Sequence, residues 1–164
     1  VNILKDVTDD FMRNRCYVPR QLCQSEGFLP ENLLDVEHRQ QAHRALAPVF
    51  ERASEHLGKA LEYELMIPAQ QVQLRLFCLL PLWMALETLV VAVGNDALLI
   101  ADRPVKISRD QVKDIIEDCL RHANDDVALR RRYASSMSKF KERFAKLAPP
   151  SRAKTTAREG YAQI

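Results

Sequence analysis

The sequence predicts an all-α fold, a helical bundle, and its composition and patterning both favour it. Of its 164 residues, 47% are hydrophobic, while only 7% are aromatic and only 4 are glycine. Leu, Ala, Glu, Arg and Gln, which are good helix formers, abound. No stretch alternates apolar and polar residues for long enough to predict a strand. We therefore expect one helical domain over residues 1–147, long enough to bury one core.

The first predicted helix covers residues 1–12 and carries a polar stripe. Asn2, Asp6 and Asp10 are four residues apart, so a helix of 3.6 residues per turn stacks them along one face. An amide oxygen and two carboxylates are hard ligands of the kind that magnesium takes, with water and substrate phosphate at its other positions. The alternative for this spacing alone is a solvated acidic face.

The middle of the chain predicts a short helix and then a long one. Residues 15–19 are expected to be extended, since the residue before a proline avoids the helical region. A short helix over residues 20–26 ends at Gly27, and a long helix over residues 36–66 follows, bent by Pro48. Its histidines have a spacing that does not suit a metal site and are expected on its solvent side: His38, His43 and His56.

The next predicted helix, over residues 69–94, is the most apolar part of the chain. No charged residue lies between Arg75 and Glu87. This run is too short to span a bilayer, so it predicts a buried core helix, kinked by Pro81. Gly94 then ends the helix.

The last part of the sequence predicts two more helices. Ser108 is typical of an N-cap and opens a helix that runs to about His122. The final helix, residues 127–147, is strongly basic on one face and apolar on the other. It can dock on the bundle or lie on anionic lipid, and docking is the default. Residues 148–164 are polar and are expected to form a disordered tail.

Charge and cysteine content limit the classes of function. A net charge of +2 gives no reason to expect a nucleic-acid partner. The 4 cysteines do not form a C-x-x-C pair, which predicts free thiols in a cytoplasmic protein, with peripheral membrane contact left open.

Three stretches resemble one known family. The run Asn2-Ile-Leu-Lys-Asp-Val-Thr-Asp-Asp10, followed by Arg15-Cys-Tyr-Val-Pro19, is similar to the second aspartate-rich motif of the squalene and phytoene synthases, N-I-L-R-D-x-x-x-D and then G-R-x-Y-x-P. Residues 76–85, Leu-Phe-Cys-Leu-Leu-Pro-Leu-Trp-Met-Ala, resemble the F-C-x-x-P-x-x-M-A helix of the squalene synthase branch. Residues 105–107, Val-Lys-Ile, resemble the V-K-I segment that follows it there.

The resemblance implies a fold and a site. The fold is the C-terminal portion of the helical bundle of isoprenoid synthases, and the expected partner within the protein is an N-terminal half that carries a first aspartate-rich motif. The implied magnesium ligands are Asn2, Asp6 and Asp10, with Asp6 and Asp10 also counted as catalytic. Lys5, where the family commonly has arginine, and Arg15 are the implied contacts to substrate diphosphate.

The resemblance also implies residues for the isoprenoid chain and for a reductant. Phe77 is expected to line the apolar cavity and to stabilise a passing carbocation, with simple core packing as the alternative. Lys106 and Arg109 are expected to contact NADPH. Ordinary surface charge is equally open for them, because Ser108 stands where the reductive enzymes carry a second cation.

The function implied is that of a squalene synthase. Such an enzyme joins two molecules of farnesyl diphosphate head to head through presqualene diphosphate, and reduces the product to squalene, a precursor of sterols or hopanoids, with Mg²⁺ and NADPH. We expect these 164 residues to be inactive by themselves. Two alternatives stay open: a phytoene or dehydrosqualene synthase that needs no reductant, and a helical assembly factor that catalyses nothing.

Overall fold

A computed structural model describes residues 1–147. These residues form helices and connecting loops, with no strand among them, so the predicted all-α class is confirmed. The predicted tail, residues 148–164, lies outside the described residues. In chain order the helices are α1 Asn2–Lys5, α2 Val7–Met12, α3 Arg20–Ser25, η1 Pro30–Asn32, η2 Val36–His38, α4 Arg39–Met66, α5 Val72–Ala92, η3 Asp96–Leu99, α6 Arg109–His122 and α7 Asp126–Ala145.

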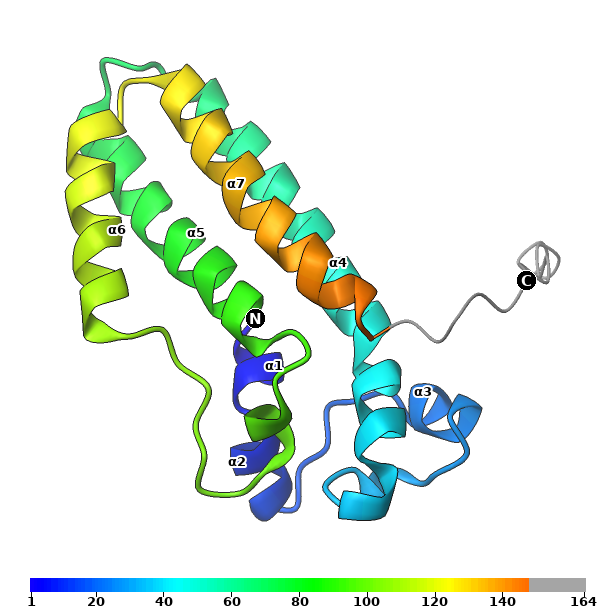
Figure 1. Ribbon diagram of the computed structural model, residues 1–164. Coiled ribbons are helices and arrows are strands. Elements are labelled where there is room, and N and C mark those ends of the chain that lie inside the picture. Colours follow the sequence, from blue (N-terminus) through cyan, green and yellow to red (C-terminus); the bar gives the residue numbers. More distant parts are fainter. Residues whose placement is uncertain (148–164) are drawn as a thin grey trace, which may run out of the picture.

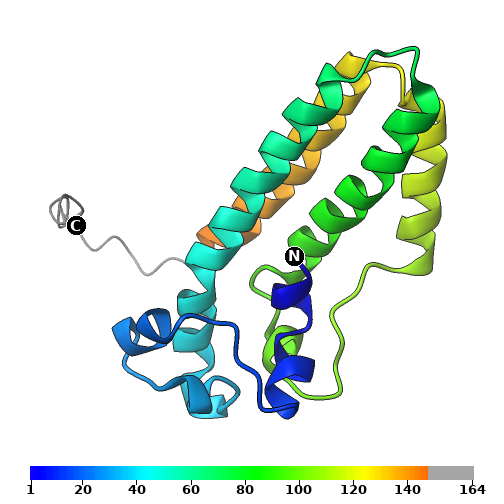
Figure 2. The ribbon, with the colours of Figure 1, turned by 180° about the vertical axis from the view of Figure 1, so that it is seen from behind.

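The four longest helices make an elongated bundle. Helix α5 packs against α4, α6 and α7, and α4 also packs against α7. The short helices α1, α2 and α3 lie together at one end of this bundle, and the connections between α4 and α5 and between α6 and α7 lie at the other (Figures 1 and 2). The two ends of the bundle are therefore built from different parts of the sequence.

Two hydrophobic cores run along the bundle, one toward each end. The first joins α1, α2 and α3 to the first half of α4 and the last turns of α5, with Leu4, Phe50 and Leu89 among its buried members. The second joins the remaining parts of α4 and α5 to α6 and α7 around Trp83, which is fully buried. Burying a large apolar side chain contributes about 1.5–3 kcal/mol, so the first core is what fixes the N-terminal helices.

Local sequence signals set most helix ends. Ser108 accepts a hydrogen bond from the backbone N–H of Gln111 at 3.1 Å, and the Gln111 side chain accepts one from the Ser108 N–H at 2.9 Å. This capping box confirms the predicted start of α6. The predicted start of α5 is wrong by three residues, because Gln71 donates to the carbonyl oxygen of Pro68 in a turn that precedes the helix.

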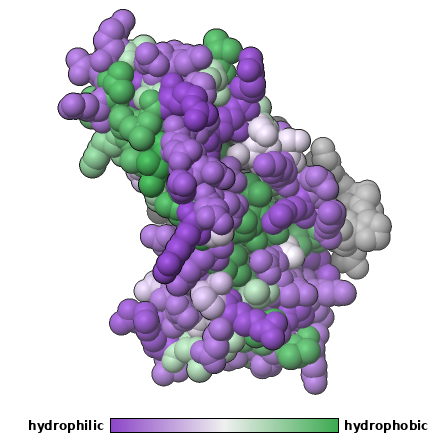
Figure 3. Space-filling model, turned by 60° about the vertical axis from the view of Figure 1, so that its left-hand side comes forward, coloured by the Kyte–Doolittle hydropathy of each residue, from purple (hydrophilic) through white to green (hydrophobic). Residues whose placement is uncertain are grey.

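Helix α5 has the length and composition of a membrane span. The core helices of soluble proteins can meet the same criteria. Just under half of the most apolar stretch of α5 is buried against the other helices. The other residues of that stretch are half-buried or exposed. Figure 3 shows apolar side chains at the surface on the side of the molecule that carries α6.

Candidate functional site

The N-terminal segment forms two short helices instead of the single predicted one. The break falls at Asp6, whose φ of −98° and ψ of 17° leave the helical region. The backbone nevertheless keeps the spacing of a helix, since the N–H of Asp6 donates to the Asn2 carbonyl and that of Asp10 donates to the Asp6 carbonyl, both at 2.8 Å. The expectation of a continuous helix is thus wrong, while the four-residue steps that stack the predicted ligands are present.

Burial separates the two sides of this segment. Leu4, Val7 and Thr8 are buried, and the two apolar ones belong to the first core. Asn2 is exposed, and Asp6 and Asp10 are half-buried. The polar side chains therefore lie away from the core, where a ligand can reach them.

Lys5 lies between the core and the polar side and forms an ion pair with Asp6. Its ammonium group is partly buried, as is the carboxylate. A cation at this position offsets the negative charge of the neighbouring carboxylates. It can also turn toward an incoming phosphate oxygen, because a lysine side chain has four flexible methylene groups.

A tight loop carries Arg15 directly after α2. The backbone N–H of Arg15 donates to the carbonyl oxygen of Asp10 at 2.9 Å, so the chain doubles back on a predicted metal ligand. Arg15 is exposed, and its side chain has no ion-pair or hydrogen-bond partner among residues 1–147. It lines a cavity of about 460 Å³ with Phe11 and Glu31, among others. A guanidinium group held this way suits the oxygens of a diphosphate.

The donor set fits magnesium in kind but is small. No group of three or more His, Cys, Asp and Glu side chains that could hold a metal ion occurs within the described part of the chain. The stripe instead offers two carboxylates and one amide oxygen. Magnesium in enzymes is commonly held by one or two carboxylates together with substrate phosphates, and the stripe matches that requirement.

Phe77 lies on α5 and belongs to neither core of residues 1–147. Its side chain is 77% exposed, and Leu74, one turn before it, is 50% exposed. The packing alternative therefore does not hold within the described residues. A helix that is apolar all round is normally buried, so this face of α5 has the character of a lining for an apolar ligand or a partner.

The two predicted NADPH contacts flank the start of α6. Lys106 and Arg109 are both exposed, and Ser108 between them is the N-cap. Because the Ser108 hydroxyl accepts the hydrogen bond of the capping box, this position is committed to the helix end. Lys106 and Arg109 are thus surface cations, and Ser108 between them stabilises the start of α6.

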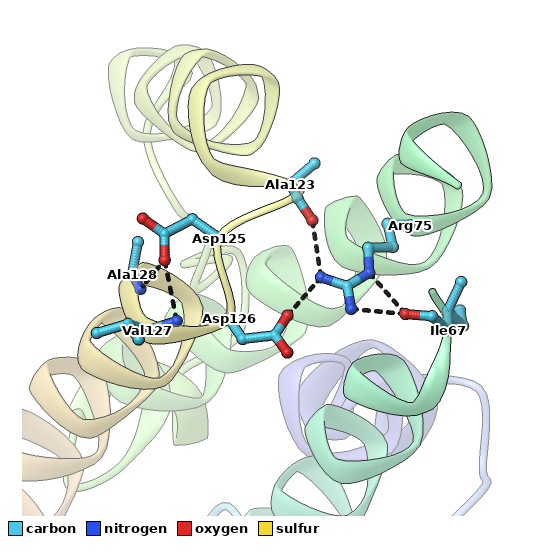
Figure 4. Close-up of polar contacts among 7 residues, drawn as sticks. All are labelled: Ile67, Arg75, Ala123, Asp125, Asp126, Val127 and Ala128. Atoms are coloured by element: carbon cyan, nitrogen blue, oxygen red, sulfur yellow. Dashed lines mark hydrogen bonds and ion pairs between the residues drawn. The ribbon is translucent and has the colours of Figure 1, made fainter. Parts of the chain in front are cut away.

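Sequence reasoning missed Arg75, a charged side chain that is almost fully buried. It is 1% exposed and donates to the Ile67 carbonyl at 2.9 and 2.6 Å, to the Ala123 carbonyl at 3.1 Å and to the Asp126 carboxylate at 2.6 Å (Figure 4). It joins the α4–α5 connection to the α6–α7 connection. The only sequence signal is a charge inside an apolar run, which does not reveal its partners.

The expectation for the histidines is wrong in two of three cases. His43 is buried, and its Nε2 lies 2.9 Å from a carboxylate oxygen of Asp96. His38 is half-buried and stacks on Phe28 with ring centroids 5.5 Å apart. Only His56 is exposed as predicted. His38 and His43 each contact a residue on another segment of the chain, and helical periodicity cannot indicate such a contact.

Comparison of the sequence with known protein families identifies the family of this chain. A family model described as squalene/phytoene synthase matches residues 1–111, which carry the polar stripe, Arg15, Phe77 and Lys106. The chain belongs to the squalene/phytoene synthase family. This is a family of all-α isoprenoid synthases, transferases that condense prenyl diphosphates head to head. No curated protein and no solved structure matches the chain.

Proposed function

We propose that the chain contributes the second aspartate-rich half of a squalene synthase. The observation that carries this proposal is the polar stripe of α1 and α2, turned away from the core and followed at once by Arg15. The stripe lies at the same end of the bundle as the last turns of α5, and α1 packs against α5. The polar site is thus adjacent to the last turns of the apolar helix α5, and Phe77 lies nearer the other end of the same helix.

The proposed reaction has two successive steps. First, the allylic C–O bond of one farnesyl diphosphate breaks, and diphosphate leaves with the electron pair. The double bond of the second molecule attacks the allylic carbon, and loss of one proton gives presqualene diphosphate. Then the second diphosphate leaves, and NADPH, where bound, would supply the hydride that reduces the product to squalene.

Each predicted residue has a task that its position supports. Asn2, Asp6 and Asp10 would hold magnesium, which stabilises the charge that develops on a departing diphosphate. Arg15 binds and orients the same diphosphate, and Lys5 contributes a second positive charge beside it. These residues act at the surface of the N-terminal helices.

Phe77 serves the hydrocarbon end. Its exposed ring can exclude water from an allylic cation and stabilise it through its π-face. The open face of α5 around Phe77 needs a cover in the working enzyme, and we propose that the helices of the N-terminal half supply it. Those helices would also bring the remaining magnesium ligands.

Lys106 and Arg109 would bind the phosphates of NADPH. A non-reductive product, dehydrosqualene or phytoene, is the second candidate, and a specific observation favours it. Ser108 fills the position of the second cation of reductive enzymes and is engaged in the capping box of α6. The third candidate, a helical assembly factor, would have no use for the polar stripe.

Product analysis on the natural-length protein tests the proposal. The protein is incubated with farnesyl diphosphate and magnesium, with and without NADPH. Squalene that forms only with NADPH is the expected result. A product independent of NADPH would move the assignment to the dehydrosqualene or phytoene branch, and no product under either condition would favour the assembly factor.

A further inference from the structure

The end of helix α2 has a backbone geometry that ties two predicted site residues together. Asn14 has a φ of +57°, in the left-handed region that few residues other than glycine adopt. Its N–H donates to the Phe11 carbonyl at 2.9 Å, and the N–H of Arg15 donates to the Asp10 carbonyl at 2.9 Å. These two bonds are those of a Schellman motif, with Asn14 at the left-handed position.

The two outer residues of this motif are the ones that the proposed function uses. Asp10 supplies the carbonyl and also carries a predicted magnesium ligand. Arg15 supplies the N–H and also carries the guanidinium for diphosphate. We propose, resting on the proposed function, that Asn14 is a positioning residue whose left-handed conformation sets Arg15 beside Asp10 so that both reach one magnesium diphosphate.

A second Schellman motif in the same chain provides the comparison. Gly27 has a φ of +84°, its N–H donates to the Gln24 carbonyl at 3.0 Å, and the N–H of Phe28 donates to the Cys23 carbonyl at 3.2 Å. Cys23 and Phe28 are both buried in the first core. The motif that ends α3 therefore positions core residues, whereas the one that ends α2 positions charged residues.

The difference in burial predicts where strain will be relieved. Residues 12–17 are exposed, so a substitution that disfavours the left-handed conformation at Asn14 can be relieved by rearranging this loop alone. The loop after α3 is anchored by the buried Phe28, so strain at Gly27 opposes the packing of the core. A Cβ at Gly27 meets no atom within 4 Å, which leaves its φ as the only source of strain.

The experiment compares Asn14→Gly, Asn14→Val and Gly27→Val in the natural-length protein. Isothermal titration calorimetry measures the binding of inorganic pyrophosphate with saturating magnesium, hydrogen exchange measures protection of the Arg15 amide, and thermal unfolding measures stability. We expect Asn14→Gly to bind within about twofold of wild type, because glycine adopts the same conformation freely. We expect Asn14→Val to bind about tenfold more weakly, with faster exchange at Arg15 and little change in Tm.

The control variant should behave in the opposite way. Gly27→Val is expected to lower Tm and to leave pyrophosphate affinity and Arg15 exchange at wild-type values. Wild-type affinity in Asn14→Val, or equal weakening in Asn14→Gly and Asn14→Val, would overturn the positioning role. Failure of the wild-type protein itself to bind magnesium pyrophosphate would instead overturn the proposed function, and the inference with it.

Discussion

Two arginines, one at each end of the bundle, are held in opposite ways. At the end with the helix connections, Arg75 is buried, and every bond that it makes goes to a backbone carbonyl or to Asp126. At the end with α1 and α2, Arg15 is exposed, and only its backbone is fixed, by the bond to Asp10. The first arrangement uses the charge to hold helices together. The second holds the backbone and keeps the charge available for a ligand.

The contrast separates structure from function within one chain. A buried arginine is stable only when its hydrogen-bond donors are paired, so Arg75 cannot bind a substrate without breaking the fold. An exposed arginine contributes little to stability, so Arg15 can be used for recognition. Substitutions at the two ends should therefore affect different measurements.

The largest loss of stability is expected for Arg75→Ala. The change removes the guanidinium and leaves the Ile67 and Ala123 carbonyls and the Asp126 carboxylate without their partner. The Asp126 side chain is 48% exposed and can be solvated by water, so the loss comes mainly from the two carbonyls left without a donor. Each costs about 1–3 kcal/mol, and urea unfolding should show a loss of about 2–4 kcal/mol. The matched control is Arg52→Ala, because Arg52 and its partner Glu55 are both exposed, and we expect a change below about 0.5 kcal/mol there. Equal stability of the two variants would contradict the structural role of Arg75.

A smaller effect, with a dependence on pH, is expected for Glu64→Gln. Glu64 is 1% exposed, and neither carboxylate oxygen has a hydrogen-bond partner among the described residues. Burial raises the pKa of this carboxyl group, and the neighbouring Cys78 thiol and then Arg75 lower it in part. The folded protein then holds the proton more tightly than the unfolded chain. As pH rises from the ordinary value of 4.5 through the raised value, the folded state therefore loses stability.

The glutamine variant has no charge to bury and should escape that loss. We expect Glu64→Gln to be more stable than wild type by about 1–2 kcal/mol at pH 8, with the difference shrinking below pH of about 4. The Cys119 thiol nearby does not interfere, since burial raises its pKa to about 11. Glu62→Gln, at an exposed position of the same helix, is the control and should show no such pH dependence. A constant advantage of Glu64→Gln at every pH would contradict the assignment.

What the sequence could predict follows from how local each signal is. The start of α6 depends on Ser108 and Gln111, three residues apart, and this capping box was predictable. The partners of Arg75 lie 8, 48 and 51 residues away, and no local pattern indicates them. The break at Asp6 was missed because a helix and two short helices in line place the same side chains four residues apart.

The candidate site shows the same division. The ligand stripe could be named from residue types and spacing, and Arg15 from the resemblance of the motif that contains it, since both lie within one segment. The ion pair of Lys5 with Asp6, the exposure of Phe77 and the use of Ser108 as a cap depend on packing. The sequence therefore indicated the chemistry of the site, and the structure was needed to show which groups are available for it.

If the stripe on α1 and α2 binds magnesium diphosphate, its carboxylates are needed for the release of pyrophosphate from farnesyl diphosphate. Natural-length wild type and the double variant Asp6→Asn, Asp10→Asn would be incubated with farnesyl diphosphate and magnesium, and inorganic pyrophosphate would be measured. We expect the double variant to lose at least about 100-fold in rate with its Tm nearly unchanged, since both side chains lie outside the core. Asp110→Asn, at an exposed position of α6, should release pyrophosphate at the wild-type rate. Unchanged release by the double variant would show that the stripe does not bind magnesium diphosphate.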